Sequence, residues 1–160
     1  MSELDYGFRQ HSNATRPSEE ITNDAFLPAL AVAELAKLYG VPNSLGDEQL
    51  KHVLLIAMDR INQNPQLQKW IHEKKKTGAS SLLEAGRSYG NYSAAVEQYK
   101  RAVYASAKAD LLRDQIAIDR KPDAENAAVT GDEMVSYYER QSTRALAELI
   151  EQKLIGVHLL

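Results

Sequence analysis

The sequence predicts an all-α protein, a bundle of four to six helices with a flexible N-terminal arm and an extended C-terminal tail. Three observations predict it. Apolar residues recur at helical spacing over several stretches. Residues that cap or end helices flank these stretches, and glycines and prolines separate them. We therefore divide the chain into an arm over residues 1–24, a helical domain over 25–154 and an apolar tail over 155–160.

The first segment is polar, without hydrophobic periodicity, and contains Pro17. Such a segment has too little apolar surface to offset the loss of chain entropy, so we expect residues 1–24 to be flexible. A binding arm is the alternative. Order is predicted to begin at residues 26–28, Phe-Leu-Pro, and a short helix is predicted over residues 29–39, ended by Gly40.

The middle of the chain predicts two helices that meet at a proline. Asp47 opens the first, which runs to about residue 63 with an apolar stripe at i, i+3 and i+4 spacing. Asn64-Pro65 then predicts either a kink or the start of a new helix. The new stretch ends at three lysines and Gly78, and its apolar residues are Leu67, Trp70 and Ile71.

The last two helices are the longest predicted ones. Residues 80–85 predict one helical turn and residues 86–92 a loop. Ser93 is a good N-cap for a helix that reaches about Asp119, and residues 120–129 form a polar loop. Thr130 and Glu133 match a capping box, which predicts a final helix to about Lys153. Six residues of these stripes are expected to make core or subunit contacts: Leu54, Trp70, Tyr99, Val103, Tyr138 and Ile150.

The composition excludes several kinds of active site. The chain has no cysteine, and its net charge of −3 argues against broad nucleic-acid binding.

Nothing resembles a signal peptide, and the longest uncharged apolar stretch, residues 25–33, is far short of the roughly 20 residues that span a bilayer. The glycines at 86 and 90 match no phosphate-binding loop. Asp110, Asp114 and Asp119 read as a solvated helix face.

The histidines do not form a metal-binding pattern. His72-Glu73 begins like a zinc-protease helix, but Lys76 occupies the position of the second histidine, and the other histidines lie far away at 11, 52 and 158. We expect no catalytic residues, no cofactor and no metal, and we interpret the chain as a binding or assembly protein.

Two features point to protein contacts. The first is the apolar tail, which either packs on its own domain or binds a partner: Ile155, Gly156, Val157, His158, Leu159 and Leu160. The second is the supply of eight tyrosines against two phenylalanines, because tyrosine favours half-buried surfaces and subunit interfaces. Helix packing is the simpler explanation for most of these tyrosines.

The order and spacing of these features resemble the head completion and stabilisation proteins, the gene-L product family of Peduovirus-like tailed bacteriophages. The resemblance covers residues 26–160, and its best stretch is residues 99–107. The start at Phe26 and Pro28, the segment around Asn64 and Trp70, and Tyr138 with Arg140 are also similar. The chain departs from the family at Pro65, and at residues 151–152, where a glycine often precedes the tail.

The resemblance implies a head–tail connector adaptor in the virion neck, assembled in the host cytoplasm. Its expected partners are the portal protein, neighbouring copies in a ring of about twelve and a tail-completion or terminator protein. Packaged DNA would pass through the ring without sequence-specific binding, and no membrane is involved. The alternatives are a helical regulatory or interaction module and a small enzyme built from scattered carboxylates.

Overall fold

The structure is a bundle of α-helices around one central helix. The computed structural model describes residues 16, 19–118 and 125–151, and side chains outside residues 125–129. Within these residues there are five α-helices: α1 (Val32–Leu38), α2 (Asp47–Asn62), α3 (Pro65–Lys76), α4 (Ala94–Ile118) and α5 (Glu125–Leu149). The predicted helical bundle is confirmed, and the only strands in the described part are four of two residues each.

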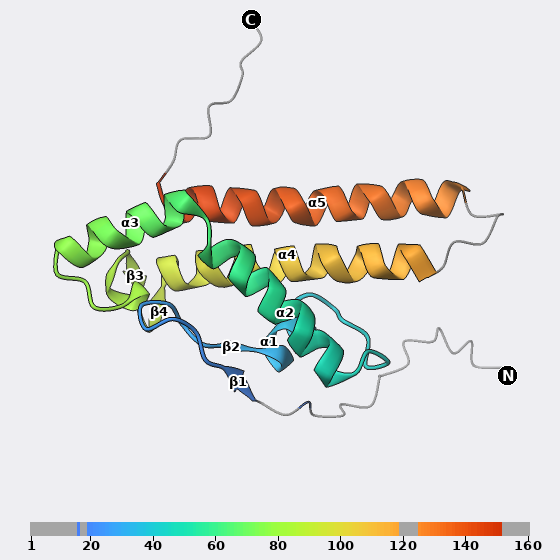
Figure 1. The fold of residues 1–160 in the computed structure, drawn as a ribbon, viewed down its shortest axis with the longest axis horizontal. Helices are drawn as coiled ribbons and strands as arrows, with labels where there is room; N and C mark the ends of the chain where they lie inside the picture. The colour runs from blue at the N-terminus through green and yellow to red at the C-terminus, as the bar shows by residue number, and fades with distance from the viewer. Residues whose placement is uncertain (1–15, 17–18, 119–124, 152–160) are drawn as a thin grey trace, which may run out of the picture.

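Helices α4 and α5 lie side by side and antiparallel, and α2 crosses α4 on another side (Figure 1). The core forms around the first two thirds of α4, where residues 102–107 are all buried. Alanines at 102, 105 and 107 let the neighbouring helices approach closely, and Val103 and Tyr104 fill the remaining space. The fold therefore rests on α4 as its centre.

Asn64 and Pro65 start a new helix and do not kink the old one. The Asn64 Oδ1 atom accepts hydrogen bonds from the backbone N–H groups of Gln66, at 3.0 Å, and Leu67, at 3.2 Å. Pro65 takes the first helical position, where a missing N–H does no harm. At the other end the chain leaves α3 through Gly78, whose φ of 99° suits glycine.

The segment before α1 contains a strand where a helix was predicted. Helix α1 begins at Val32, and the two residues before it form β2 (Leu30–Ala31), which pairs antiparallel with β1 (Glu20–Ile21). The sequence of residues 29–31 has no feature that excludes a strand, and pairing with β1 makes Leu30 and Ala31 a strand instead of the first turn of the helix. The predicted start of this helix, at residue 29, was therefore three residues too early.

The folded body also begins before the predicted boundary at residue 24. Ile21 is buried, and Asn23 makes hydrogen bonds to Pro28, Asn62 and Tyr99. The boundary was wrong because these partners lie up to 76 residues away in the chain. The remainder of the arm, residues 1–15 and 17–18, lies outside the described residues.

The loop predicted over residues 86–92 contains a small hairpin. A 3-10 turn, η1 (Leu82–Glu84), leads to β3 (Ser88–Tyr89), which pairs with β4 (Tyr92–Ser93). Gly90, with φ of 61°, takes the first place in the two-residue turn, where left-handed backbone is needed. Ser93 caps α4 as predicted, because its Oγ accepts from the N–H of Val96 at 3.3 Å.

The predicted capping box at Thr130 and Glu133 is wrong. Helix α5 already begins at Glu125, so both residues lie inside it. Residues 125–128, Glu-Asn-Ala-Ala, include three good helix formers. They extend the helix toward the N-terminus, so that it begins before Thr130. The helix ends at Leu149, and Glu151 has the left-handed φ of 57°, which stops it short of the predicted Lys153.

Candidate functional site

Two groups of buried polar side chains in the body are held by hydrogen bonds within the chain. The Tyr99 hydroxyl donates to Asn62 Oδ1 at 2.6 Å and accepts from Asn23 Nδ2 at 2.8 Å. Asn62 Nδ2 in turn donates to Asn23 Oδ1 at 2.9 Å, which closes a ring of three side chains. Burial raises the pKa of Tyr99 to about 12, against the effect of its two hydrogen bonds. This group joins the N-terminal segment, α2 and α4.

A second group joins α1 and β2 to α4. The Tyr104 hydroxyl donates to Glu34 Oε2 at 2.6 Å, and Lys100 Nζ lies 3.1 Å from Glu34 Oε1. The backbone N–H of Ala31 donates to the same hydroxyl at 3.3 Å. Burial raises the pKa of Tyr104, and the hydrogen bond to Glu34 raises it further. Both groups are satisfied within the chain, so they stabilise the body.

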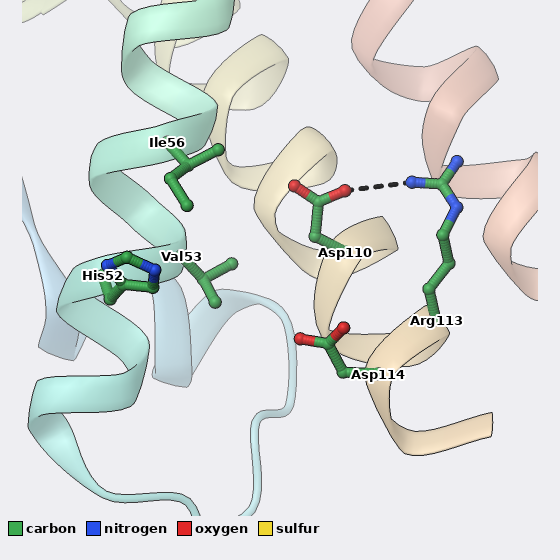
Figure 2. A pocket seen from close by; sticks show the side chains of 6 residues that line it. All are labelled: His52, Val53, Ile56, Asp110, Arg113 and Asp114. Atoms are coloured by element: carbon green, nitrogen blue, oxygen red, sulfur yellow. Dashed lines mark hydrogen bonds and ion pairs between the residues drawn. The ribbon is translucent and has the colours of Figure 1, made fainter. Parts of the chain in front are cut away.

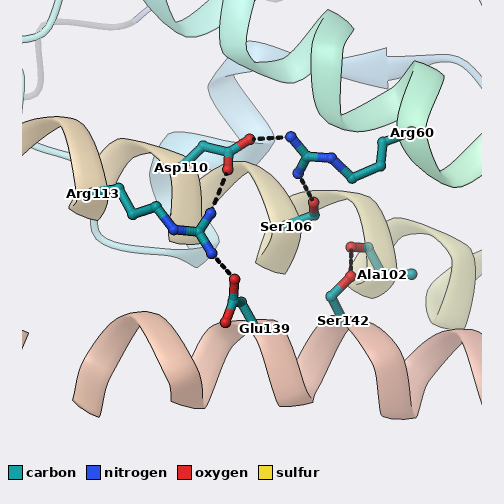
Figure 3. Close-up of polar contacts among 7 residues, drawn as sticks. All are labelled: Arg60, Ala102, Ser106, Asp110, Arg113, Glu139 and Ser142. Atoms are coloured by element: carbon teal, nitrogen blue, oxygen red, sulfur yellow. Dashed lines mark hydrogen bonds and ion pairs between the residues drawn. The ribbon is translucent and has the colours of Figure 1, made fainter. Parts of the chain in front are cut away.

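An ionic network on the surface joins α2, α4 and α5 (Figure 3). Asp110 on α4 receives two guanidinium groups, from Arg60 at 2.9 Å and from Arg113 at 2.9 Å. Arg60 also donates to the Ser106 hydroxyl at 2.7 Å, and Arg113 pairs with Glu139 on α5. Because the arginines are about half exposed, each pair is worth about 0–1 kcal/mol, and the network mainly sets how the three helices meet.

A groove of about 230 Å³ runs between α2 and α4 beside this network. Val53 and Ile56 point from α2 toward α4, and Asp110 and Asp114 point back toward them (Figure 2). His52 and Arg113 complete the lining. Asp110 and Asp114 were interpreted as a solvated helix face, because the sequence of α4 alone does not reveal the arginine that α2 supplies. Asp119 lies outside the described residues.

Exposed apolar and aromatic side chains gather at two further places. On the α4–α5 hairpin, Ile118 is 81% exposed, and Met134 and Tyr137 are about half exposed. On the β3–β4 hairpin, Tyr89 and Tyr92 face each other across the strands and are 64% and 70% exposed. Met134 and Tyr137 belong to the apolar positions of α5, yet within a single chain they are about half exposed to solvent. Surfaces of this kind suit protein contacts.

Five of the six residues expected in core or subunit contacts lie in the core. They are Leu54, Trp70, Tyr99, Val103 and Ile150. Tyr138 is half-buried, and its ring centroid lies 6.0 Å from that of Tyr39 and 5.1 Å from that of Tyr137. The six tail residues, 155–160, lie outside the described part of the chain.

The described residues contain no cluster of three or more His, Asp or Glu side chains suited to a metal. His52 lines the groove and His72 is exposed on α3, whereas His11 and His158 are not described. None of the described helices is long and apolar enough to cross a membrane.

A helical body with a surface groove and exposed aromatic side chains suits a structural or assembly protein. The family model for the phage head completion protein (GPL) matches residues 21–160. The chain therefore belongs to the phage head completion protein family and has a structural role in phage head assembly. This family is a structural one and not a known enzyme family. Neither a curated protein nor a solved structure matches the chain.

Proposed function

We propose that this protein is a head–tail connector adaptor: copies of it form a ring beneath the portal protein, extend the DNA channel and dock the tail. The observation that carries the proposal is the match to the head completion family over residues 21–160. The ring holds about twelve copies, since a ring under a twelve-fold portal follows the portal's symmetry. It assembles in the host cytoplasm and stays in the virion neck, where a tail-completion or terminator protein binds its far side.

The subunit surface supports a ring. Ile118, Met134 and Tyr137 are exposed along the α4–α5 hairpin and supply apolar area for a neighbouring copy. Tyrosine is enriched at such interfaces because its ring buries apolar area while its hydroxyl stays hydrogen-bonded. The net charge of −3 suits a channel through which DNA slides without sequence-specific binding.

The C-terminal tail, residues 155–160, is the proposed anchor to the portal. The chain leaves α5 at Glu151, and the apolar residues follow four positions later. Burying Val157, Leu159 and Leu160 contributes on the order of 1.5–3 kcal/mol each, before the entropy of fixing the tail is subtracted. In an extended tail Val157 and Leu159 point to the same side, as strand addition to a portal sheet edge requires. Repetition around a ring makes the attachment effectively permanent.

Deleting residues 156–160 tests the anchor. The truncated protein should keep the melting temperature of the full chain but no longer bind portal, as measured by light scattering of the mixture, and no longer join filled heads to tails. A matched pair of point variants sharpens the test. Leu159→Asp should abolish portal binding, whereas Leu38→Asp, at a leucine that is 61% exposed on α1, should not.

Two outcomes contradict the anchor. If the truncated protein unfolds, the tail belongs to the core of its own domain. If it binds portal with unchanged affinity, the tail is dispensable. Native mass spectrometry of the portal complex tests the ring separately, and a stoichiometry of one adaptor per portal assembly would overturn it.

A further inference from the structure

The groove between α2 and α4 has an apolar floor and one free acidic group. The side chain of Val53 is only 6% exposed, and that of Ile56, which also lines the groove, is 44% exposed. Both oxygens of Asp110 are occupied, one by Arg60 and the other by Arg113. Asp114 makes no ion pair or hydrogen bond with any described residue. The complementary ligand is therefore an apolar side chain with a cation next to it.

The N-terminal segment reaches the fold at the start of α2, one of the two helices that line this groove. Arg16 pairs with Asp47, the first residue of α2, at 2.9 Å, and donates to the carbonyl oxygens of Pro42 at 2.9 Å and Leu45 at 3.2 Å. Its side chain is only 10% exposed, so this attachment is firm. His52, the first groove residue on α2, lies five residues beyond Asp47, a rise of about 8 Å along the helix.

The segment that precedes Arg16 carries the complementary side chains. Leu4, Tyr6 and Phe8 alternate with Asp5 and Gly7, so an extended chain places them on one side. The cation, Arg9, follows directly. From Arg9 to Arg16 the chain spans at most about 23 Å, which exceeds the rise of about 8 Å along α2 from Asp47 to His52.

We propose that residues 4–9 occupy the groove of their own chain, with Phe8 on Val53 and Ile56 and with Arg9 paired to Asp114. The short tether favours the same chain over a second copy, because it holds the segment at an effective concentration of order millimolar. The N-terminal segment then covers the apolar floor and neutralises Asp114. This assignment is independent of portal binding.

Disulfide trapping tests the proposal on the full chain, which has no cysteine of its own. Gln10→Cys with His52→Cys leaves Phe8 and Arg9 intact. Gln10→Cys with His72→Cys is the matched control, because His72 is also an exposed histidine but lies on α3, beyond the far end of α2. Under mild oxidation the first cysteine pair should form its intrachain disulfide about tenfold faster than the control pair. The oxidised chain is detected on a non-reducing gel as a band that migrates ahead of the reduced chain.

Equal closure of the two pairs would overturn the proposal. A disulfide-linked dimer as the main product of the first pair would also overturn it, since the groove would then hold the segment of a second copy. The partner charges are tested in the same assay. Asp114→Arg should slow closure about fivefold, and Arg9→Asp in that background should restore it. An unchanged rate in Asp114→Arg would remove the ion pair from the proposal.

Discussion

The two ends of α4 lie in different surroundings although they belong to one continuous helix. Around residues 102–107 every side chain is buried, because α5, α2 and the β2–α1 segment cover the helix on different sides. From Arg113 to Ile118 no side chain is fully buried, and α5 lies alongside (Figure 1). A helix that is apolar all round is buried all round, whereas its polar continuation has one neighbour. The molecule therefore has a core body and a projecting hairpin.

The two helices of the hairpin approach each other closely at Gly131. Gly131 on α5 faces Ile116 on α4 so closely that a Cβ atom there would lie 2.7 Å from Ile116 Cδ1. Nearer the body, the Ser142 hydroxyl donates to the carbonyl oxygen of Ala102 at 2.7 Å. Because fewer buried groups hold it, the outer hairpin should open locally at lower free energy than the body.

The largest expected difference between the two regions concerns side-chain truncation. Leu54→Ala removes a fully buried side chain beside α4 and should lower the free energy of unfolding by about 2–5 kcal/mol. Ile118→Ala, at a side chain that is 81% exposed, should change it by less than about 0.5 kcal/mol. Urea denaturation measures both. Similar losses for the two variants would show that the hairpin is already packed against something.

Alkaline pH should lower the folding stability of the body. Burial raises the folded-state pKa of Tyr99 from 10.0 to about 12, so the folded state prefers the protonated phenol. The resulting stability is fully present below pH 10 and is lost as the pH rises through 12. For two pKa units this loss is about 2.7 kcal/mol, and ionisation of Tyr104, whose pKa is also raised, adds to it.

Urea denaturation at pH 9 and at pH 11.5 measures this loss. In Tyr99→Phe the decline between the two values should be smaller than in the parent, whereas Tyr137→Phe, at an exposed hydroxyl on the hairpin, should leave it unchanged. An identical decline in all three proteins would contradict the assignment to Tyr99.

Gly131 provides a test of the hairpin itself. Gly131→Ala should destabilise by about 1 kcal/mol, because the new methyl group overlaps the Ile116 side chain. In an Ile116→Ala background the same change should stabilise by up to about 1 kcal/mol, since alanine is the better helix former. Amide hydrogen exchange of the hairpin reports both effects. If Gly131→Ala stabilised the hairpin in the parent protein, the two helices would not approach each other this closely.

The smallest expected effect lies where α5 ends. Glu151 holds a left-handed φ of 57°, which a side chain disfavours. Glu151→Gly should therefore raise the free energy of unfolding by about 1 kcal/mol. Glu133→Gly, within α5, should lower it by about 1 kcal/mol. Thermal unfolding distinguishes the two directions, and a loss of stability in Glu151→Gly would contradict a helix end at this residue.

Local signals predicted most of the helices. Ser93 and the Asn64-Pro65 pair mark starts that the structure has, and the stripe of α2 matches its buried face. The errors arose where contacts with residues far away in the sequence determine the local structure. Residues 20–24 became part of the body because Leu30 pairs with Ile21 and Tyr99 binds Asn23, and the short-range sequence contains neither fact.

The candidate sites were predicted less well, for the same reason. Asp110 looked solvated along α4, and only the approach of Arg60 from α2 makes it part of a network. The family was indicated by the order of features along the chain, which requires no contact to be known. The portal-binding role of residues 155–160 stays a prediction.

The ring of Asn23, Asn62 and Tyr99 also dictates an order of events during synthesis. Its members are separated by up to 76 residues, and the Tyr104–Glu34 bond spans 70. While the ribosome is still making α2 and α3, the N-terminal segment lacks its partners Tyr99 and Tyr104 on α4. Because non-local closure is slow, Asn23 and Ala31 make their contacts with α4 only after that helix has been synthesised. Until then Phe26, Leu27 and Leu30, which are buried in the folded protein, lack part of their cover.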